Sequence, residues 1–476
     1  MRSSTRLFSL AAGLVLAAPL AACGDDDDVV DPGPDTAQLR VVHASPDAPA
    51  VDIYARGSDQ PLVTALAYGQ ASPYITVDEG TYTLEVKPAG QPGAAAAFTT
   101  GPLWVGDEKR YTAVAAGFLG STAEEDRFRV LALEDGFAPT ANDQARVRVV
   151  HASADAPTVG VDVGADDPGN PEVASLARFA DTGREGIALP AGTPLAVGIT
   201  AGGATVTRFT TPPLPGGTPL YVFAVGRIGQ LPREATGFSL LAVAEGGVVA
   251  ILQQDPTVYA LHASPDAPPV DIREATSDAL LAGNLAYGAI GGVQVPPGDY
   301  TLDFYAAGSV PGTPAASAQV TGLAAGQRYL AIATGFLSPA AGEPAFQLVA
   351  VRDDLAIDPA RARLGVVHAS PDAPSVDVGT AVGAVMDQPA LVEDLVFGDS
   401  AAGEGLAVPP ATLRIGVAAA NTTAAVATFA VTTTAGLRAF AVATGALSPS
   451  AGEQPFRLTI IDTTASPWTA TAIAPN

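Results

Sequence analysis

Short runs of alternating apolar and polar residues, each bounded by a turn signal, occur through most of the chain. The clearest run is at residues 81–87, where Tyr82, Leu84 and Val86 alternate with polar residues, and residues 299–304 repeat the pattern. A period of two residues indicates a β-strand with one face towards a core. No segment shows a long helical period, and the many glycines and prolines, 50 and 41, divide the chain into short pieces. The pattern therefore predicts an all-β protein.

One heptapeptide recurs along the chain and divides it into copies. His-Ala-Ser-Pro-Asp-Ala-Pro occupies residues 43–49 and returns at 151–157 (with Ala154 in place of the first proline), 262–268 and 368–374. These four motifs contain all 4 histidines of the chain. They recur at intervals of about 110 residues, which is the size of an ordinary independent domain. The chain is therefore expected to contain four copies of one domain, named repeats 1 to 4 here.

Each repeat is expected to form several short strands. A strand precedes each motif, at residues 39–44, 147–152, 258–263 and 364–369, and the Ser-Pro-Asp-Ala-Pro that follows has turn chemistry. A second strand begins at an apolar-Asp-apolar step, and alternation places its Asp on the opposite face from its apolar neighbours. Final strands are expected at 128–133, 238–242, 346–351 and 456–461. About seven strands per copy predict a β-sandwich of the immunoglobulin-like class.

A tyrosine early in a late strand strengthens this expectation. Tyr111, Tyr221 and Tyr329 occupy this place in repeats 1 to 3, and Phe440 occupies it in repeat 4. The arrangement resembles the tyrosine corner of immunoglobulin-like sandwiches, in which the phenol bonds to backbone across a turn. Phe440 has no hydroxyl, so the resemblance is weakest in repeat 4.

The four repeats are of two kinds in the order A-B-A-B. Repeats 1 and 3 share Leu-Ala-Tyr-Gly at residues 66–69 and 285–288, and repeats 2 and 4 share Asp-Val-Gly at 162–164 and 377–379. A duplicated two-domain unit explains this order, and two neighbouring domains are then expected to pack together. The expected segments are a signal peptide (1–22), an acidic tether (23–37), sandwiches at 38–140, 145–250, 256–356 and 361–463, and a C-terminal tail (464–476).

The first residues have the pattern of a targeting segment. Arg2 and Arg6 precede an uncharged apolar stretch at 7–20, which is too short for a comfortable membrane span. The stretch ends in Leu-Ala-Ala-Cys at 20–23, which resembles the lipobox of bacterial lipoproteins and implies that Cys23 carries a lipid. The alternative is an ordinary secretory signal with an incidental cysteine. Cys23 is the only cysteine, so no internal disulfide is expected.

The acidic composition limits the choice of partners. Residues 24–37 are rich in Asp and are expected to form a disordered tether; a metal-binding role for this Asp run is the alternative. The formal net charge of −25 argues against nucleic acid as a partner. The expected contacts are a membrane, through the lipid of Cys23, and a protein or glycan at the cell surface. The expected location is the cell envelope, on the periplasmic face or the cell surface.

A family resemblance rests on the longest version of the motif. Residues 41–52, Val-Val-His-Ala-Ser-Pro-Asp-Ala-Pro-Ala-Val-Asp, together with Leu-Ala-Tyr-Gly and the Tyr-Thr-Leu-Glu-Val strand, resemble the domain-of-unknown-function 4397 (DUF4397) family. Such domains occur in tandem in secreted and surface bacterial proteins. The resemblance implies an architecture and an extracytoplasmic location, but no activity.

The motif also has the residue types that catalysis or metal binding would use. His43, Ser45, Asp47 and Asp52 lie close in sequence, but a nucleophilic triad needs them to converge in space, and the chain has no Gly-x-Ser-x-Gly elbow. One His per repeat with two carboxylates is a conceivable metal ligand set. An acidic loop at Asp166, Asp167, Asn170 and Glu172 is a conceivable calcium site, but it lacks EF-hand spacing.

A structural role in the turn is the interpretation we favour, because all four copies retain the motif and a binding site would more often diverge between them. No catalytic residue, metal or cofactor is therefore expected, and the chain is expected to act as a surface spacer or binding scaffold. A metal-binding or metal-dependent enzymatic module is the alternative. The motif residues that both interpretations use are His43, Asp47, Asp52, His151, Asp155, Asp162, His262, Asp266, Asp271, His368, Asp372 and Asp377.

Overall fold

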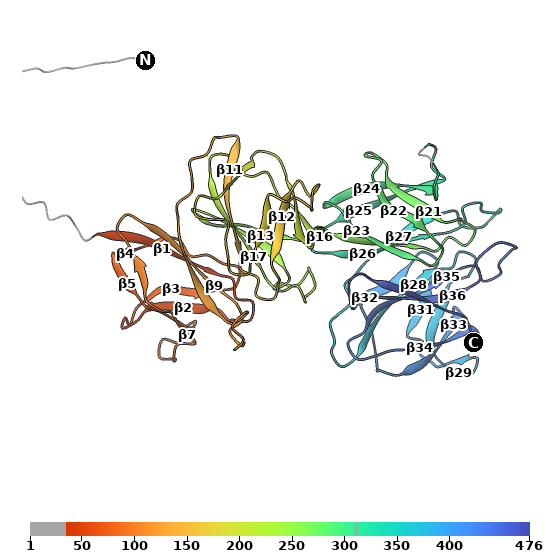
Figure 1. Ribbon diagram of the computed structural model, residues 1–476. Coiled ribbons are helices and arrows are strands. Elements are labelled where there is room, and N and C mark those ends of the chain that lie inside the picture. The colour runs from red at the N-terminus through yellow and green to blue at the C-terminus, as the bar shows by residue number, and fades with distance from the viewer. Residues whose placement is uncertain (1–34, 310–311) are drawn as a thin grey trace, which may run out of the picture.

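The computed structural model describes residues 35–309 and 312–476. All regular structure in these two segments is β-strand, as the alternating pattern predicts (Figure 1). No helix in them is long and apolar enough to cross a membrane. The proposed signal peptide, Cys23 and most of the acidic tether lie outside the described residues.

The strands of repeats 1 and 2 run as follows. Repeat 1 contains β1 (Thr36–His43), β2 (Val51–Ala55), β3 (Pro61–Leu66), β4 (Ile75–Asp78), β5 (Gly80–Tyr82), β6 (Leu84–Pro88), β7 (Phe98–Thr99), β8 (Leu103–Val105), β9 (Arg110–Ala116) and β10 (Arg129–Glu134). Repeat 2 contains β11 (Gln144–His151), β12 (Val159–Val163), β13 (Val173–Leu176), β14 (Ile187–Pro190), β15 (Ala196–Ala201), β16 (Ala204–Thr210), β17 (Pro219–Val225), β18 (Ser239–Ala244) and β19 (Gly247–Gln253).

Repeats 3 and 4 follow the same plan. Repeat 3 contains β20 (Thr257–His262), β21 (Val270–Glu274), β22 (Leu280–Leu285), β23 (Ile290–Gln294), β24 (Gly298–Ala306), β25 (Ala316–Leu323), β26 (Arg328–Thr334) and β27 (Gln347–Arg352). Repeat 4 contains β28 (Ala362–Ala369), β29 (Val376–Val382), β30 (Val385–Met386), β31 (Val392–Leu395), β32 (Ser400–Val408), β33 (Thr412–Ala419), β34 (Ala425–Thr432), β35 (Arg438–Thr444), β36 (Arg457–Asp462) and β37 (Thr469–Ile473).

Each repeat contributes two sheets that pack as a sandwich-like unit. In repeat 1 the strand orders are β10-β9-β1-β4 and β3-β2-β6-β7, and a small β5-β8 pair lies beside them. In repeat 2 they are β14-β11-β17-β18-β19 and β13-β12-β15-β16. Repeat 3 has β23-β20-β26-β27 and β22-β21-β24-β25, and repeat 4 has β32-β28-β35-β36-β37 and β30-β29-β33-β34.

The strand that carries each motif histidine lies inside its sheet. In repeat 1, β1 pairs with β9 in parallel and with β4 in antiparallel fashion, and the other repeats pair their first strand in the same way. Leu39 and Val41 of β1 face the core between the two sheets of repeat 1. Val42 and Ala44 face the opposite side and are also fully buried. A strand buried on both faces explains why both alternating positions are apolar.

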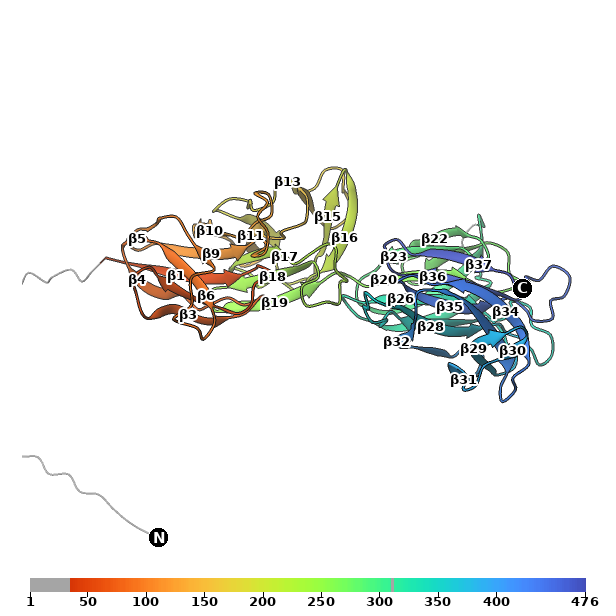
Figure 2. The same cartoon turned by 90° about the horizontal axis from the view of Figure 1, so that it is seen from below.

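The second buried face is a contact between neighbouring repeats. Val42 and Val114 of repeat 1 pack in one cluster with Tyr221, Phe223 and further apolar residues of repeat 2. An equivalent cluster joins repeats 3 and 4, with Leu261 and Ile332 against Phe440, Val442 and other residues. Repeats therefore pack in two pairs, 1 with 2 and 3 with 4, and Figures 1 and 2 show the pairs as the two halves of the molecule.

Two features of repeats 2 and 4 differ from the expectations. Each has an additional edge strand, β19 or β37, which pairs with the preceding strand, so residues 464–476 contain a strand rather than only a tail. Tyr221 and Phe440 are shifted by one register position relative to Tyr111 and Tyr329. Because a shift of one residue turns a side chain to the other face of a strand, Tyr221 and Phe440 point into the contacts between repeats.

The tyrosines of repeats 1 and 3 make the expected backbone contacts. The backbone N–H of Gly106 donates to the phenol oxygen of Tyr111 (3.2 Å), and that of Ala324 donates to Tyr329 (3.1 Å). The Tyr329 hydroxyl also donates to the carbonyl of Gly322 (3.2 Å). The expectation of a tyrosine that bonds across a turn is therefore correct for the A-type repeats and wrong for repeat 2, and Phe440 of repeat 4 makes no such bond, as its lack of a hydroxyl requires.

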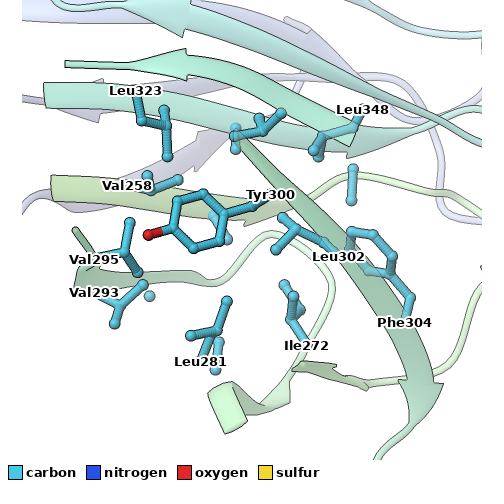
Figure 3. Close-up of a pocket in the computed structure, with 16 residues that line it drawn as sticks. Val258, Ile272, Leu281, Val293, Val295, Tyr300, Leu302, Phe304, Leu323 and Leu348 are labelled. Atoms are coloured by element: carbon cyan, nitrogen blue, oxygen red, sulfur yellow. The ribbon is translucent and has the colours of Figure 1, made fainter. Parts of the chain in front are cut away.

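The core of repeat 3 contains a small cavity. A cavity of about 30 Å³ lies between its sheets and is lined entirely by apolar side chains and Tyr300 (Figure 3). Ala260 and Ala282 line it, whereas the register of the strands places Val41 and Val63 at the same positions of repeat 1. Smaller side chains at equivalent sites account for the cavity.

Candidate functional site

The four motif histidines are buried at the ends of their first strands and close the turn that follows. In each repeat the ring Nε2 lies within hydrogen-bond distance of the carbonyl oxygen of the last motif proline. The four pairs are His43 and Pro49 (3.1 Å), His151 and Pro157 (2.9 Å), His262 and Pro268 (2.9 Å), and His368 and Pro374 (3.0 Å). A carbonyl can only accept, so Nε2 carries the proton and the neutral ring is the Nε2–H tautomer.

Aromatic residues cover three of these rings. Tyr68 and Tyr287, from the shared Leu-Ala-Tyr-Gly segments, pack edge-on against His43 and His262, with ring centroids 6.3 and 5.9 Å apart. Phe397 packs in the same way against His368. The segment that distinguishes A-type repeats thus shields the histidine of the same repeat from solvent.

Burial lowers the pKa of each motif histidine below its usual value. Loss of hydration is the largest cause in all four, and the hydrogen bond to the proline carbonyl opposes it. Nδ1 of His43, His151 and His262 is buried without a hydrogen-bond partner among the described residues. Protonation would place a second N–H in that apolar environment, so the neutral form is favoured.

The motif serine connects the turn to a distant part of the same sheet. Its hydroxyl donates to the carbonyl of the glycine that follows the parallel partner strand. The four contacts are Ser45 to Gly117 (2.6 Å), Ser153 to Gly226 (2.8 Å), Ser264 to Gly335 (2.7 Å) and Ser370 to Gly445 (2.6 Å). These glycines have positive φ, and an added Cβ would lie about 2.3 Å from a backbone oxygen, so only glycine fits there.

The motif aspartate binds the loop that begins at the same glycine. Both carboxylate oxygens of Asp47 accept from backbone amides, those of Leu119 (2.8 Å) and Gly120 (2.9 Å). Asp266 and Asp372 make the equivalent pairs of contacts. Asp155, in the motif that lacks the first proline, makes one such contact, to the amide of Ile228 (3.1 Å).

The second aspartate fixes two other loops in three of the four repeats. Asp52 accepts from Ala65 (2.7 Å) and Gly90 (2.9 Å), and Asp271 and Asp377 accept from equivalent amides. Ala65, Asn284 and Asp394, which donate these bonds, all have left-handed backbones with φ near 50°. The carboxylate thus stabilises a conformation that these residues rarely adopt. Asp162 differs, because its Oδ2 is buried without a partner among the described residues.

The predicted site residues are therefore brought close together, and in repeats 1 to 3 the serine hydroxyl also lies 3.2–3.4 Å from the first motif aspartate, but the shorter contacts of these groups are to backbone. The motif serine bonds to a glycine carbonyl, and the histidine Nε2 bonds to a proline carbonyl, so neither group is aimed at the other. In the segments that the structure describes, no group of three or more His, Cys, Asp or Glu side chains lies close enough to hold a metal ion. In the acidic loop of repeat 2, Glu172 accepts from the backbone amide of Val163 (2.6 Å).

Two aspartates outside the motif, one half-buried and one fully buried, were not identified from the sequence. Asp135 of repeat 1 accepts hydrogen bonds from Thr112 (3.2 Å), from Tyr74, and from Tyr221 of repeat 2 (2.7 Å). Asp353 occupies the equivalent place in repeat 3 and is fully buried among three arginines. The available signal was an Asp directly after a strand that is apolar on both faces, but several partners of these two aspartates lie in other repeats.

Arginines from repeats 2, 3 and 4 surround the carboxylate of Asp353. Its Oδ2 lies 2.5 Å from Nη2 of Arg328, 3.5 Å from Nη1 of Arg438 and 3.7 Å from Nη1 of Arg233. Arg328 and Arg438 also donate to the carbonyl of Thr463, and Arg233 donates to that of Leu355 (2.6 Å). One carboxylate therefore organises the junction at which the two pairs of repeats meet.

Comparison with known proteins adds a family but no activity. A family model described as "Domain of unknown function (DUF4397)" matches residues 26–162 and 256–379, which together make up more than half of the chain. No curated protein matches the chain. Among solved structures, the Bacillus anthracis TIE protein is matched over 84% of this chain and 67% of its own, at 10% identity and a TM-score of 0.15.

Proposed function

The chain belongs to the DUF4397 family, and from this premise we propose that it is a non-catalytic scaffold of repeated β-sandwich modules in the cell envelope. In this proposal the four repeats are immunoglobulin-like domains in the order A-B-A-B. Cys23 carries a lipid that holds the protein to a membrane. The modules act as a spacer or present binding surfaces to a protein or glycan. Linked modules suit such a role, since weak contacts multiply when they are joined.

One observation carries the proposal. In each repeat the histidine, the serine and the first aspartate of the motif make their shortest polar contacts with backbone groups of the same repeat, and the one contact among them is a longer serine–aspartate bond in repeats 1 to 3. Groups used in this way stabilise turns, and they are not directed at a common point where a substrate atom could react. The conserved use of the motif in all four repeats supports a role in folding each module.

Cell fractionation tests the anchoring and the location together. The full chain is expected in the membrane fraction and in a form that incorporates labelled fatty acid, whereas Cys23→Ser should lose the label and leave the membrane. Protease added to intact cells or to spheroplasts then reports on which side of a membrane the repeats lie. Retention of Cys23→Ser in the membrane, or protection of the repeats in spheroplasts, would contradict the proposal.

A further inference from the structure

A cleft of about 770 Å³ lies where the two pairs of repeats meet. One wall comes from β16 and the loop at 228–232 of repeat 2, and the other comes from β20 and β23 of repeat 3, with residues 464–467 closing one side. Its volume falls in the range of ligand-binding clefts, about 300–1,000 Å³.

Polar contacts hold the two walls of this cleft in place. Gln294 of β23 accepts from the backbone amide of Arg208 in β16 (3.0 Å) and donates to the carbonyl of Asp255 (3.2 Å). Arg233 crosses from repeat 2 to Asp353 and Leu355 of repeat 3. A cleft whose walls are already joined loses little conformational freedom on binding, which favours affinity.

The lining of the cleft is almost free of charge. The chain has 49 acidic residues, yet within the described segments no acidic residue lines the cleft, and Arg328 is the single charged residue that does. Arg328 is itself engaged by Asp353. Val206 and Ile228, on the wall from repeat 2, are large apolar residues with exposures of 59% and 54%. The lining therefore fits an uncharged ligand with apolar groups.

The cleft also contains a free strand edge. β23 is the edge strand of its sheet, pairs regularly with β20 and contains no proline or charged residue. Among the described residues, no backbone bond from outside the sheet reaches residues 290–293. Gly292 lines the cleft, and a Cβ there would lie 2.6 Å from the Tyr259 ring, so the glycine lets that ring pack over the strand. Such an edge is a template for an added strand, whose main chain pairs with it.

The aromatic residues of the cleft do not favour a sugar. Tyr259 and Phe238 are almost fully buried, and the Tyr259 ring is stacked on Trp468 with centroids 4.1 Å apart. Neither ring presents an open face on which a sugar could stack. An extended peptide uses the features that are present, namely a backbone edge and apolar positions across from it.

We propose that this cleft binds an extended, uncharged peptide segment of a partner protein, which pairs with the free edge of β23 and places apolar side chains against Val206 and Ile228. This peptide site is a specific form of the binding role proposed above and rests on that role, but peptide binding does not require the lipid anchor. If the protein is anchored as proposed but does not bind the peptide, only the peptide site is contradicted. If the protein is not anchored, the peptide-binding result is unaffected.

A titration with a defined peptide tests the proposal. The probe is a capped, fluorescent peptide of alternating Thr and Val, about eight residues long, which is a typical strand length. Fluorescence anisotropy with the full mature chain should show saturable binding in the micromolar range. A second peptide of the same sequence, N-methylated at alternate residues so that it cannot donate along one edge, should bind at least about tenfold more weakly.

Matched variants locate the site without disturbing the core. Val206→Glu and Ile228→Glu change exposed side chains on the cleft wall and should each weaken binding about tenfold or more. Val249→Glu, at an equally exposed residue of β19 that does not line the cleft, should leave binding unchanged. Absence of saturable binding up to about 1 mM, equal affinity of the N-methylated peptide, or equal loss in Val249→Glu would each overturn the proposal.

Discussion

In repeat 3, Nε2 of His262 lies 2.9 Å from the carbonyl oxygen of Pro268, six residues further along the chain. The histidine thereby closes the turn that begins at its own strand end, and the three other repeats contain the same contact. In the repeated motif the histidine ring, the serine hydroxyl and the aspartate carboxylate therefore each hold a different backbone segment.

Removal of one motif histidine should destabilise its own repeat. His262→Ala deletes a buried ring and leaves the Pro268 carbonyl without its donor, so a loss of about 2–4 kcal/mol is expected. His262→Gln should lose less, because the amide of Gln can still donate to that carbonyl. Hydrogen exchange of strands β20 and β21 measures the change within repeat 3. Equal exchange in the wild type and His262→Ala would contradict the role of the ring in the turn.

The buried histidines should make stability fall in mild acid. Their pKa is lowered in the folded protein, mainly by burial, whereas the unfolded chain has the ordinary value near 6.5. Above about pH 6.5 both states are neutral at these rings, and below it the unfolded state binds more protons, so stability decreases until the folded pKa is passed.

Denaturant titrations between about pH 7.5 and 5 would measure this dependence. A variant with all four motif histidines changed to Gln serves as the control, since glutamine does not titrate. The variant should lose most of the pH dependence in this window. A slope as steep as that of the wild type would show that other groups are responsible.

The second aspartate offers a comparison between two repeats of the same chain. Asp52→Asn removes one of two carboxylate acceptors that hold the amides of Ala65 and Gly90, and should cost about 1–3 kcal/mol. Asp162→Asn changes the equivalent residue in repeat 2, where Oδ2 has no partner, and should be neutral or stabilising because it removes a buried charge. Denaturant unfolding of both variants checks the difference; similar losses would contradict it.

The cavity in repeat 3 predicts a stabilising substitution (Figure 3). Ala260→Val restores the side chain that repeat 1 has at Val41 and should raise the free energy of unfolding of repeat 3 by about 0.5–1.5 kcal/mol. The reciprocal change, Val41→Ala, should destabilise repeat 1 by a similar or larger amount. Differential scanning calorimetry can follow both. A destabilising Ala260→Val would mean that the space cannot accept two methyl groups without strain.

The local features of the fold could be predicted from the sequence because they depend on nearby residues. The sequence located the strand that carries each motif histidine and, in repeats 1 and 3, the last strand, and the histidine at a strand end before a proline-rich turn suggested a structural role in that turn. The structure places Asp52 on the opposite face from Val51 and Ile53, as a period of two requires.

The features that were not predicted depend on contacts between repeats. Tyr221 differs from Tyr111 by one register position, and a single sequence does not reveal that shift although it turns the ring from a turn to an interface. The run of apolar residues at 220–225 was visible and indicates a strand buried on both faces, but it does not identify the repeat that covers it. The partners of Asp353 likewise come from three repeats and are distant in sequence.

Thermal unfolding of the soluble chain, residues 24–476, with and without a chelator tests the central claim most directly. If the motif groups serve only to hold backbone, the melting temperature should be the same with chelator, without it, and after Ca²⁺ or Zn²⁺ is added back. A melting temperature that falls with chelator and is restored by one ion would contradict the account, because a bound metal would then be stabilising the folded repeats.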